Sequence, residues 1–131
     1  MTTQYHLEKR QFVRVPKTLS VSYRLTGVSG EDVGSETLTG ETENISAGGM
    51  LLKGHLPDPN IITELLMRRV VLLVRMELPD VDHTVTALAR VSWLDSIDVE
   101  SGLFSLGLEY KEITKEAQDK IIAFILRGMQ P

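Results

Sequence analysis

The feature that most constrains this fold is a series of short segments in which apolar and polar residues alternate. In the first segment every second residue from Leu19 to Leu25 is apolar, and this period of two predicts a strand with one buried face. Similar patterns predict further strands at residues 36–45, from Met50, and at residues 69–78, 84–94 and 103–110. Because no long helical connection separates these segments, we expect an antiparallel sheet of about six strands, closed or nearly closed into a small barrel.

The last segment of the chain changes its period. Thr114 is a good N-cap residue, and from Ala117 to Ile125 the apolar residues recur at helical spacing. This pattern predicts an amphipathic helix over about residues 114–128 that packs its apolar face on the sheet and closes one end of it. Residues 61–68 fit either a helical turn or a loop.

The composition fits one globular domain and excludes several classes of protein. Of the 131 residues, 42% are hydrophobic and 24% are charged. The chain has no cysteine, which excludes disulfides, a thiolate nucleophile and a cysteine-ligated zinc site. It has no apolar run of the ~20 residues that a membrane span needs, and its N-terminus lacks the apolar core of a signal peptide, so we expect a cytoplasmic protein.

Charge and motif content argue against nucleic acid binding and catalysis. The net charge is −4, whereas a general DNA or RNA binder is expected to carry a basic excess. The short motifs of hydrolases, metalloproteases and P-loop enzymes are absent, and the three histidines lack the spacing of metal ligands. We therefore expect no catalytic residue, no metal site and no cofactor.

Basic residues gather near the N-terminus of this acidic chain. Lys9, Arg10 and Arg14 lie within six residues of one another. Arg10 and Arg14 face one side both in an extended segment and in a helical turn, so both guanidinium forks can reach the same ligand. We expect residues 1–17 to form a mobile arm, and residues 18–131 to form the barrel with its helix.

A second motif, at residues 44–49, combines short polar side chains with two glycines. Asn44 and Ser46 project on the same side of an extended chain and can bind base edges, hydroxyls or phosphate oxygens. Gly48 and Gly49 lack Cβ atoms, which lets a ligand approach the backbone or lets the chain adopt positive φ. Taken alone, these residue types are equally typical of an ordinary turn or β-bulge.

The two motifs in this order resemble those of the PilZ domain family. An Arg-x-x-x-Arg motif is followed, after one predicted strand and a loop, by Asn-x-Ser-x-x-Gly, and residues 89–93 and 106–110 also look like family strands. The residues that carry the match are Lys9, Arg10, Arg14, Asn44, Ser46 and Gly49. The resemblance covers nearly the whole chain, and it implies a mainly β fold, a six-stranded antiparallel, Greek-key-like barrel with a C-terminal α-helix.

The resemblance also implies a bacterial, non-enzymatic receptor for the second messenger cyclic di-GMP. This ligand has two guanines and two phosphates, and the guanine O6 and N7 acceptors match a bidentate arginine. Arg10 and Arg14 would clamp the guanines and phosphates, and Lys9 would add positive charge at the rim.

On the barrel side, the 44–49 motif would supply the other half of the site. Asn44 and Ser46 would hydrogen-bond a guanine, while Gly48 and Gly49 would permit close approach. The ligand would then bridge the arm and the barrel, order the arm, and change the surface offered to a downstream protein of motility or exopolysaccharide machinery. Either a monomer or a homodimer fits this scheme.

Three other interpretations are consistent with parts of the sequence. The first is a PilZ-like adaptor that binds a protein but no nucleotide; a small-barrel RNA binder and an unrecognised hydrolase have less support. For Arg90 two positions are open, facing the ligand surface or simply pointing outward from the barrel, and we favour the outward one. Trp93 is expected to pack in the core or at the rim rather than to stack on a ligand.

Overall fold

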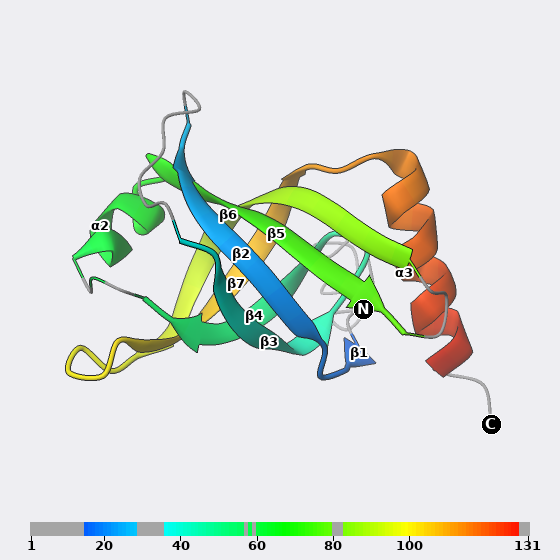
Figure 1. The fold of residues 1–131 in the computed structure, drawn as a ribbon, viewed down its shortest axis with the longest axis horizontal. Coiled ribbons are helices and arrows are strands. Elements are labelled where there is room, and N and C mark those ends of the chain that lie inside the picture. Colours follow the sequence, from blue (N-terminus) through cyan, green and yellow to red (C-terminus); the bar gives the residue numbers. More distant parts are fainter. Residues whose placement is uncertain (1–14, 29–35, 57, 59, 80–82, 129–131) are drawn as a thin grey trace, which may run out of the picture.

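A computed structural model describes residues 15–28, 36–56, 58, 60–79 and 83–128 (Figure 1). No helix among them is long and apolar enough to cross a membrane. The strands are β1 (Val15–Pro16), β2 (Ser20–Gly27), β3 (Leu38–Ile45), β4 (Gly49–His55), β5 (Val70–Leu78), β6 (His83–Ile97) and β7 (Leu103–Glu112). The helices are α2 (Ile61–Leu66) and α3 (Lys115–Gly128).

Strands β2 to β7 form a closed antiparallel barrel, which confirms the predicted fold class. The sheet order is β1-β3-β2-β5-β6-β7-β4, and pairing between β3 and β4 closes the ring. The short strand β1 was not predicted. It lies at the end of the sheet order, where a proline is tolerated, and it pairs Val15 with Ile45 and Pro16 with Asn44.

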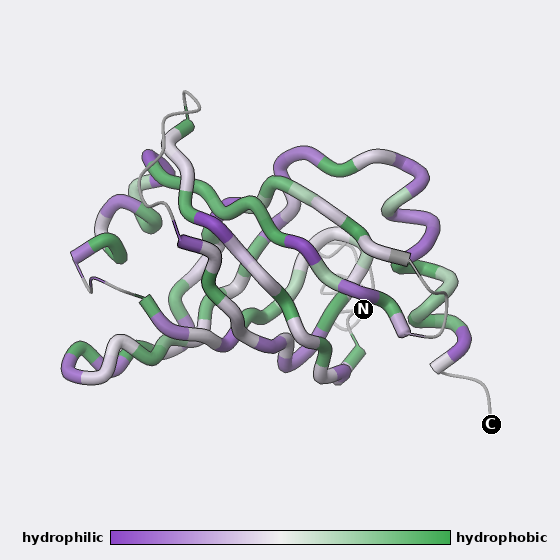
Figure 2. Tube along the Cα trace, in the orientation of Figure 1, coloured by the Kyte–Doolittle hydropathy of each residue, from purple (hydrophilic) through white to green (hydrophobic). Residues whose placement is uncertain are grey.

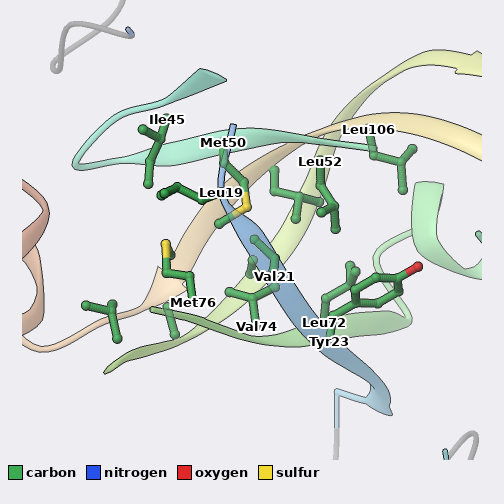
Figure 3. Packing of buried hydrophobic residues seen from close by; sticks show 14 of the residues in the cluster. Leu19, Val21, Tyr23, Ile45, Met50, Leu52, Leu72, Val74, Met76 and Leu106 are labelled. Atoms are coloured by element: carbon green, nitrogen blue, oxygen red, sulfur yellow. The ribbon is translucent and has the colours of Figure 1, made fainter. Parts of the chain in front are cut away.

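The alternation seen in the sequence builds the core of the barrel. Figure 2 shows polar and apolar stretches following one another along the strands. The buried side chains of Val21, Leu72 and Val74 meet inside the barrel (Figure 3). Tyr23 is also buried: its hydroxyl donates to the His55 carbonyl at 2.7 Å and accepts from the His55 N–H at 3.0 Å, so this polar group is satisfied inside the core.

The two helices lie at opposite ends of the barrel (Figure 1). At the start of α3, Thr114 Oγ1 accepts from the Ala117 N–H at 3.0 Å, which confirms the predicted N-cap. The buried face of α3 consists of Ile121, Phe124 and Ile125. Residues 61–68, for which the sequence allowed either a helical turn or a loop, contain α2, and this helix ends at Leu66. Arg68 follows the helix and is a non-glycine residue with a positive φ of 61°.

Strand β6 extends three residues beyond the predicted end at residue 94. Its pairing with β7 shifts register between Val91 and Trp93 and again between Leu94 and Ser96. Each irregularity changes which residues face outward, so the period of two fades although the strand continues. The same shifts decide where Trp93 lies.

Candidate functional site

The β3–β4 turn is built by the side chain of Ser46. This hydroxyl accepts from the N–H groups of Gly48 and Gly49, both at 3.1 Å, and lies 3.3 Å from the Gly49 carbonyl oxygen. The Ser46 N–H also donates to the Gly49 carbonyl at 2.8 Å. Only 3% of Ser46 is exposed. Its hydrogen-bonding capacity is therefore used within the turn, which it holds in shape.

Gly49 is required by the close approach of a neighbouring strand. A Cβ atom built on Gly49 would lie 2.0 Å from the backbone carbonyl oxygen of Leu108 on β7. Positive φ is not the reason for either glycine of the motif, because among the described glycines only Gly102 has it. The Gly48 carbonyl accepts from the Tyr110 N–H at 2.9 Å, so the turn is anchored on β7 as well.

Asn44 carries the unsatisfied polar atom of the motif. Its side chain is half-buried near the end of β3, and its Oδ1 is buried without a hydrogen-bond partner among the described residues. A buried acceptor that lacks a partner costs about 1–3 kcal/mol. The acceptor of Asn44 is therefore left unused by the part of the barrel that the structure describes.

Strand register places five residues from five strands in one row across the outer face of the barrel. This outer row consists of Pro16, Asn44, Leu51, Gly107 and Trp93. Ile45 beside Asn44, and both neighbours of Leu51 and of Gly107, are buried in the core, so the row lies on the outside. It runs from β1 to the only tryptophan of the chain.

The indole of Trp93 lies against the backbone of Gly107. A Cβ atom on Gly107 would come within 2.3 Å of three ring atoms of Trp93. A glycine inside a strand allows this close approach. Trp93 keeps 36% of its surface exposed. It thus packs on the outer face rather than in the core, where it presents an aromatic surface in line with Asn44.

The next row along the strands holds an ion pair. Glu109 is opposite Gly49 on one side and opposite Arg90 on the other. Nη2 of Arg90 donates to Oε1 of Glu109 at 2.6 Å, and Nε donates to the same oxygen at 3.2 Å. Arg90 points outward, as predicted, but onto the face that carries the 44–49 motif.

Comparison with known proteins shows the family of the chain. The model of the PilZ domain matches residues 8–127, nearly the whole chain. The chain belongs to the PilZ domain family. No curated protein sequence matches it.

Solved structures with the same fold are distant in sequence. The inhibitor of motility MotI/DgrA of Bacillus subtilis is 22% identical with a TM-score of 0.63, over 91% of this chain and 50% of that one. The PilZ domain of CeSA from a cellulose-synthesizing bacterium is 18% identical with a TM-score of 0.52, over 90% of this chain and 99% of that one. The PilZ domain of YcgR from Escherichia coli, solved with c-di-GMP, is 11% identical with a TM-score of 0.56, over 91% and 90%. This PilZ chain thus spans about half the length of MotI/DgrA.

The arginine motif of this PilZ domain, which consists of Arg10 and Arg14, lies outside the described residues. The preceding Lys9 lies outside them as well. The last residues of the predicted arm are held against the barrel. Val15 and Pro16 pair with β3, and the Lys17 carbonyl accepts from the Thr42 hydroxyl at 2.5 Å. The Lys17 ammonium lies 5.8 Å from the centre of the Phe124 ring on α3. Residues 15–17 therefore lie against both the 44–49 motif and the C-terminal helix α3.

The tyrosine beside the turn is neutral at ordinary pH. Burial raises the pKa of Tyr110, and its hydroxyl has no hydrogen-bond partner among the described residues. The sequence pattern indicated Tyr110 as a strand residue but not its backbone contact to Gly48, since that contact depends on how β7 passes the turn.

Proposed function

We propose that this chain is a receptor for cyclic di-GMP, which binds along the outer row between β1 and Trp93. The observation that carries the proposal is the buried Oδ1 of Asn44, which has no hydrogen-bond partner among the described residues. Asn44 lies in the same row as Trp93 and pairs with β1, the strand that directly follows the arginine motif in the chain. Membership of the PilZ family supports the same ligand, and YcgR was solved with c-di-GMP.

Chain connectivity supports a role for the arginine motif at this row. Arg14 is bonded to Val15, whose partner across the strands is Ile45, the residue after Asn44. Arg10 is five residues from Val15, and five residues span at most ~18 Å. Both guanidinium groups can therefore reach a ligand on the row. Their forks match guanine O6 and N7 and phosphate oxygens, and Lys9 adds a further positive charge.

The barrel supplies the fixed part of the proposed site. The Asn44 amide has both donors and an acceptor for a guanine edge. The exposed part of the Trp93 ring offers a surface for a base, and base–aromatic stacking contributes about 1–3 kcal/mol. Ser46, Gly48 and Gly49 hold the turn that positions Asn44, so they act on the ligand mainly through that turn.

In the proposed mechanism, binding of the ligand orders the arm, and no reaction is catalysed. A ligand held by the arm and the barrel together favours the state in which the arm lies on the row, by its difference in affinity for the two states. Because the arm continues into Lys17 beside α3, this change alters a surface that a downstream protein can bind.

Calorimetric titration with cyclic di-GMP tests the proposal directly. Wild type should bind, whereas Arg10→Ala with Arg14→Ala should weaken binding by about a hundredfold or more, as expected for the loss of two charge-assisted contacts. Arg75→Ala removes an exposed arginine from β5, on the opposite wall of the barrel, and should bind like wild type. Near-wild-type affinity of the double variant would refute the site. No binding by wild type would favour the adaptor that recognises a protein alone.

A further inference from the structure

The ion pair between Arg90 and Glu109 borders the proposed ligand row. Glu109 lies opposite Gly49, the last residue of the 44–49 motif. It is two residues from Gly107, on which Trp93 packs, so both positions are on the same face of β7. A carboxylate therefore stands beside a site that is proposed to take a ligand with two phosphates.

The geometry of the pair indicates that it can open. Both Arg90 contacts go to one oxygen of Glu109, and the two side chains are 36% and 50% exposed. Ion pairs at this exposure stabilise a fold only weakly. An arginine can donate to two oxygens of a phosphate in a bidentate, charge-assisted interaction, whereas Arg90 uses a single oxygen of Glu109. Arg90 can thus move from Glu109 to a ligand phosphate at little cost to the fold, while the carboxylate that it leaves repels the ligand.

We infer that the Arg90–Glu109 pair sets the affinity of the site: Arg90 is a ligand contact, and Glu109 competes with the ligand for it. This inference rests on the proposed function, and it concerns two residues outside both recognised motifs. The receptor would respond at a higher cyclic di-GMP concentration than the same site without Glu109. The alternative is that Glu109 accepts directly from a guanine N–H, which predicts the opposite sign for its removal.

Glu109→Gln separates these two roles, because it keeps the shape of the side chain and removes its charge. For two phosphates assumed to lie about 8 Å from the lost charge in solvent-like surroundings, Coulomb's law gives an affinity gain of about two- to fivefold. The gain should shrink at high salt, where exposed charges are screened. Arg90→Gln should weaken binding by about tenfold, since it removes a charged donor and leaves the carboxylate.

Glu64→Gln is the matched control. Glu64 lies on α2, at the end of the barrel away from α3 (Figure 1). Its two carboxylate oxygens accept hydrogen bonds from Nε and Nη2 of Arg69 at 3.0 and 3.1 Å. It should bind cyclic di-GMP like wild type at every salt concentration. A thermal melt of each variant checks that the fold is kept. In the Arg90→Gln background, Glu109→Gln should tighten binding less than it does in wild type, because no arginine remains for which the carboxylate can compete.

The outcomes are distinct in calorimetry. Tighter binding by Glu109→Gln, unchanged binding by Glu64→Gln and weaker binding by Arg90→Gln support the inference. If wild type binds and Glu109→Gln behaves like Glu64→Gln, or binds more weakly, the inference is wrong while the proposed function stands. If wild type does not bind cyclic di-GMP, both are wrong.

Discussion

Replacing Asn44 by leucine should stabilise the ligand-free protein and weaken its response to ligand. The Oδ1 atom of Asn44 is buried without a partner among the described residues, and such an acceptor costs about 1–3 kcal/mol. Leucine has a similar shape and no polar atom. Because the Asn44 side chain as a whole is only half-buried, we expect the lower part of that range, about 1 kcal/mol of added stability.

Thermal unfolding with and without cyclic di-GMP measures both effects. For a domain of this size, 1 kcal/mol corresponds to a rise of about 3–5 °C in Tm. A ligand at a hundred times its Kd stabilises wild type by about 2.7 kcal/mol, which adds a further rise. Asn44→Leu should begin from the higher Tm and gain only about half as much from the same ligand concentration, about 1.4 kcal/mol, if the lost hydrogen bonds lower its affinity by about tenfold.

Asn60→Leu is the control for this prediction. Asn60 precedes α2, is exposed, and makes no side-chain cap hydrogen bond. Its replacement should leave the ligand-induced rise in Tm unchanged. If Asn44→Leu lowers Tm by several degrees, or if it keeps the full ligand-induced rise, the interpretation of Asn44 as an unsatisfied acceptor that binds the ligand is wrong.

Three further substitutions test other parts of the structure. Gly49→Ala should lower the free energy of unfolding by about 1–3 kcal/mol or more in a denaturant titration, because its Cβ meets the Leu108 carbonyl oxygen; unchanged stability would contradict the close packing. Trp93→Ala should weaken cyclic di-GMP binding by about tenfold or more, with Trp93→Phe keeping most of the affinity; equal affinity of the alanine variant would exclude a stacking role. Burial raises the pKa of Tyr110, so its contribution to stability is present below the unfolded pKa of about 10 and is lost as pH rises above it. Tyr110→Phe should therefore unfold less readily than wild type in alkaline melts, and identical alkaline curves would refute this assignment.

Much of the fold follows from local patterns in the chain. The alternation around Tyr23 specifies a strand whose inner face is buried, since side chains of an extended chain alternate between two faces. Thr114 marks the start of α3 because its hydroxyl satisfies a free N–H of the first turn. The Arg-x-x-x-Arg motif and the 44–49 motif together indicated the PilZ family, which the match over residues 8–127 confirms.

The tertiary structure decided what those local patterns do at the site. Ser46 stabilises the β3–β4 turn by accepting from the Gly49 N–H, and Gly49 allows β7 to pack closely against the turn. Both roles depend on which strand lies beside the turn. Trp93 reaches the outer row only because β6 shifts register against β7, and a period of two cannot show such a shift. Arg90 and Glu109 are nineteen residues apart in the chain and meet through strand pairing. A sequence pattern reports the face on which a side chain lies, whereas its neighbours across the barrel are set by register, which involves the whole closed sheet.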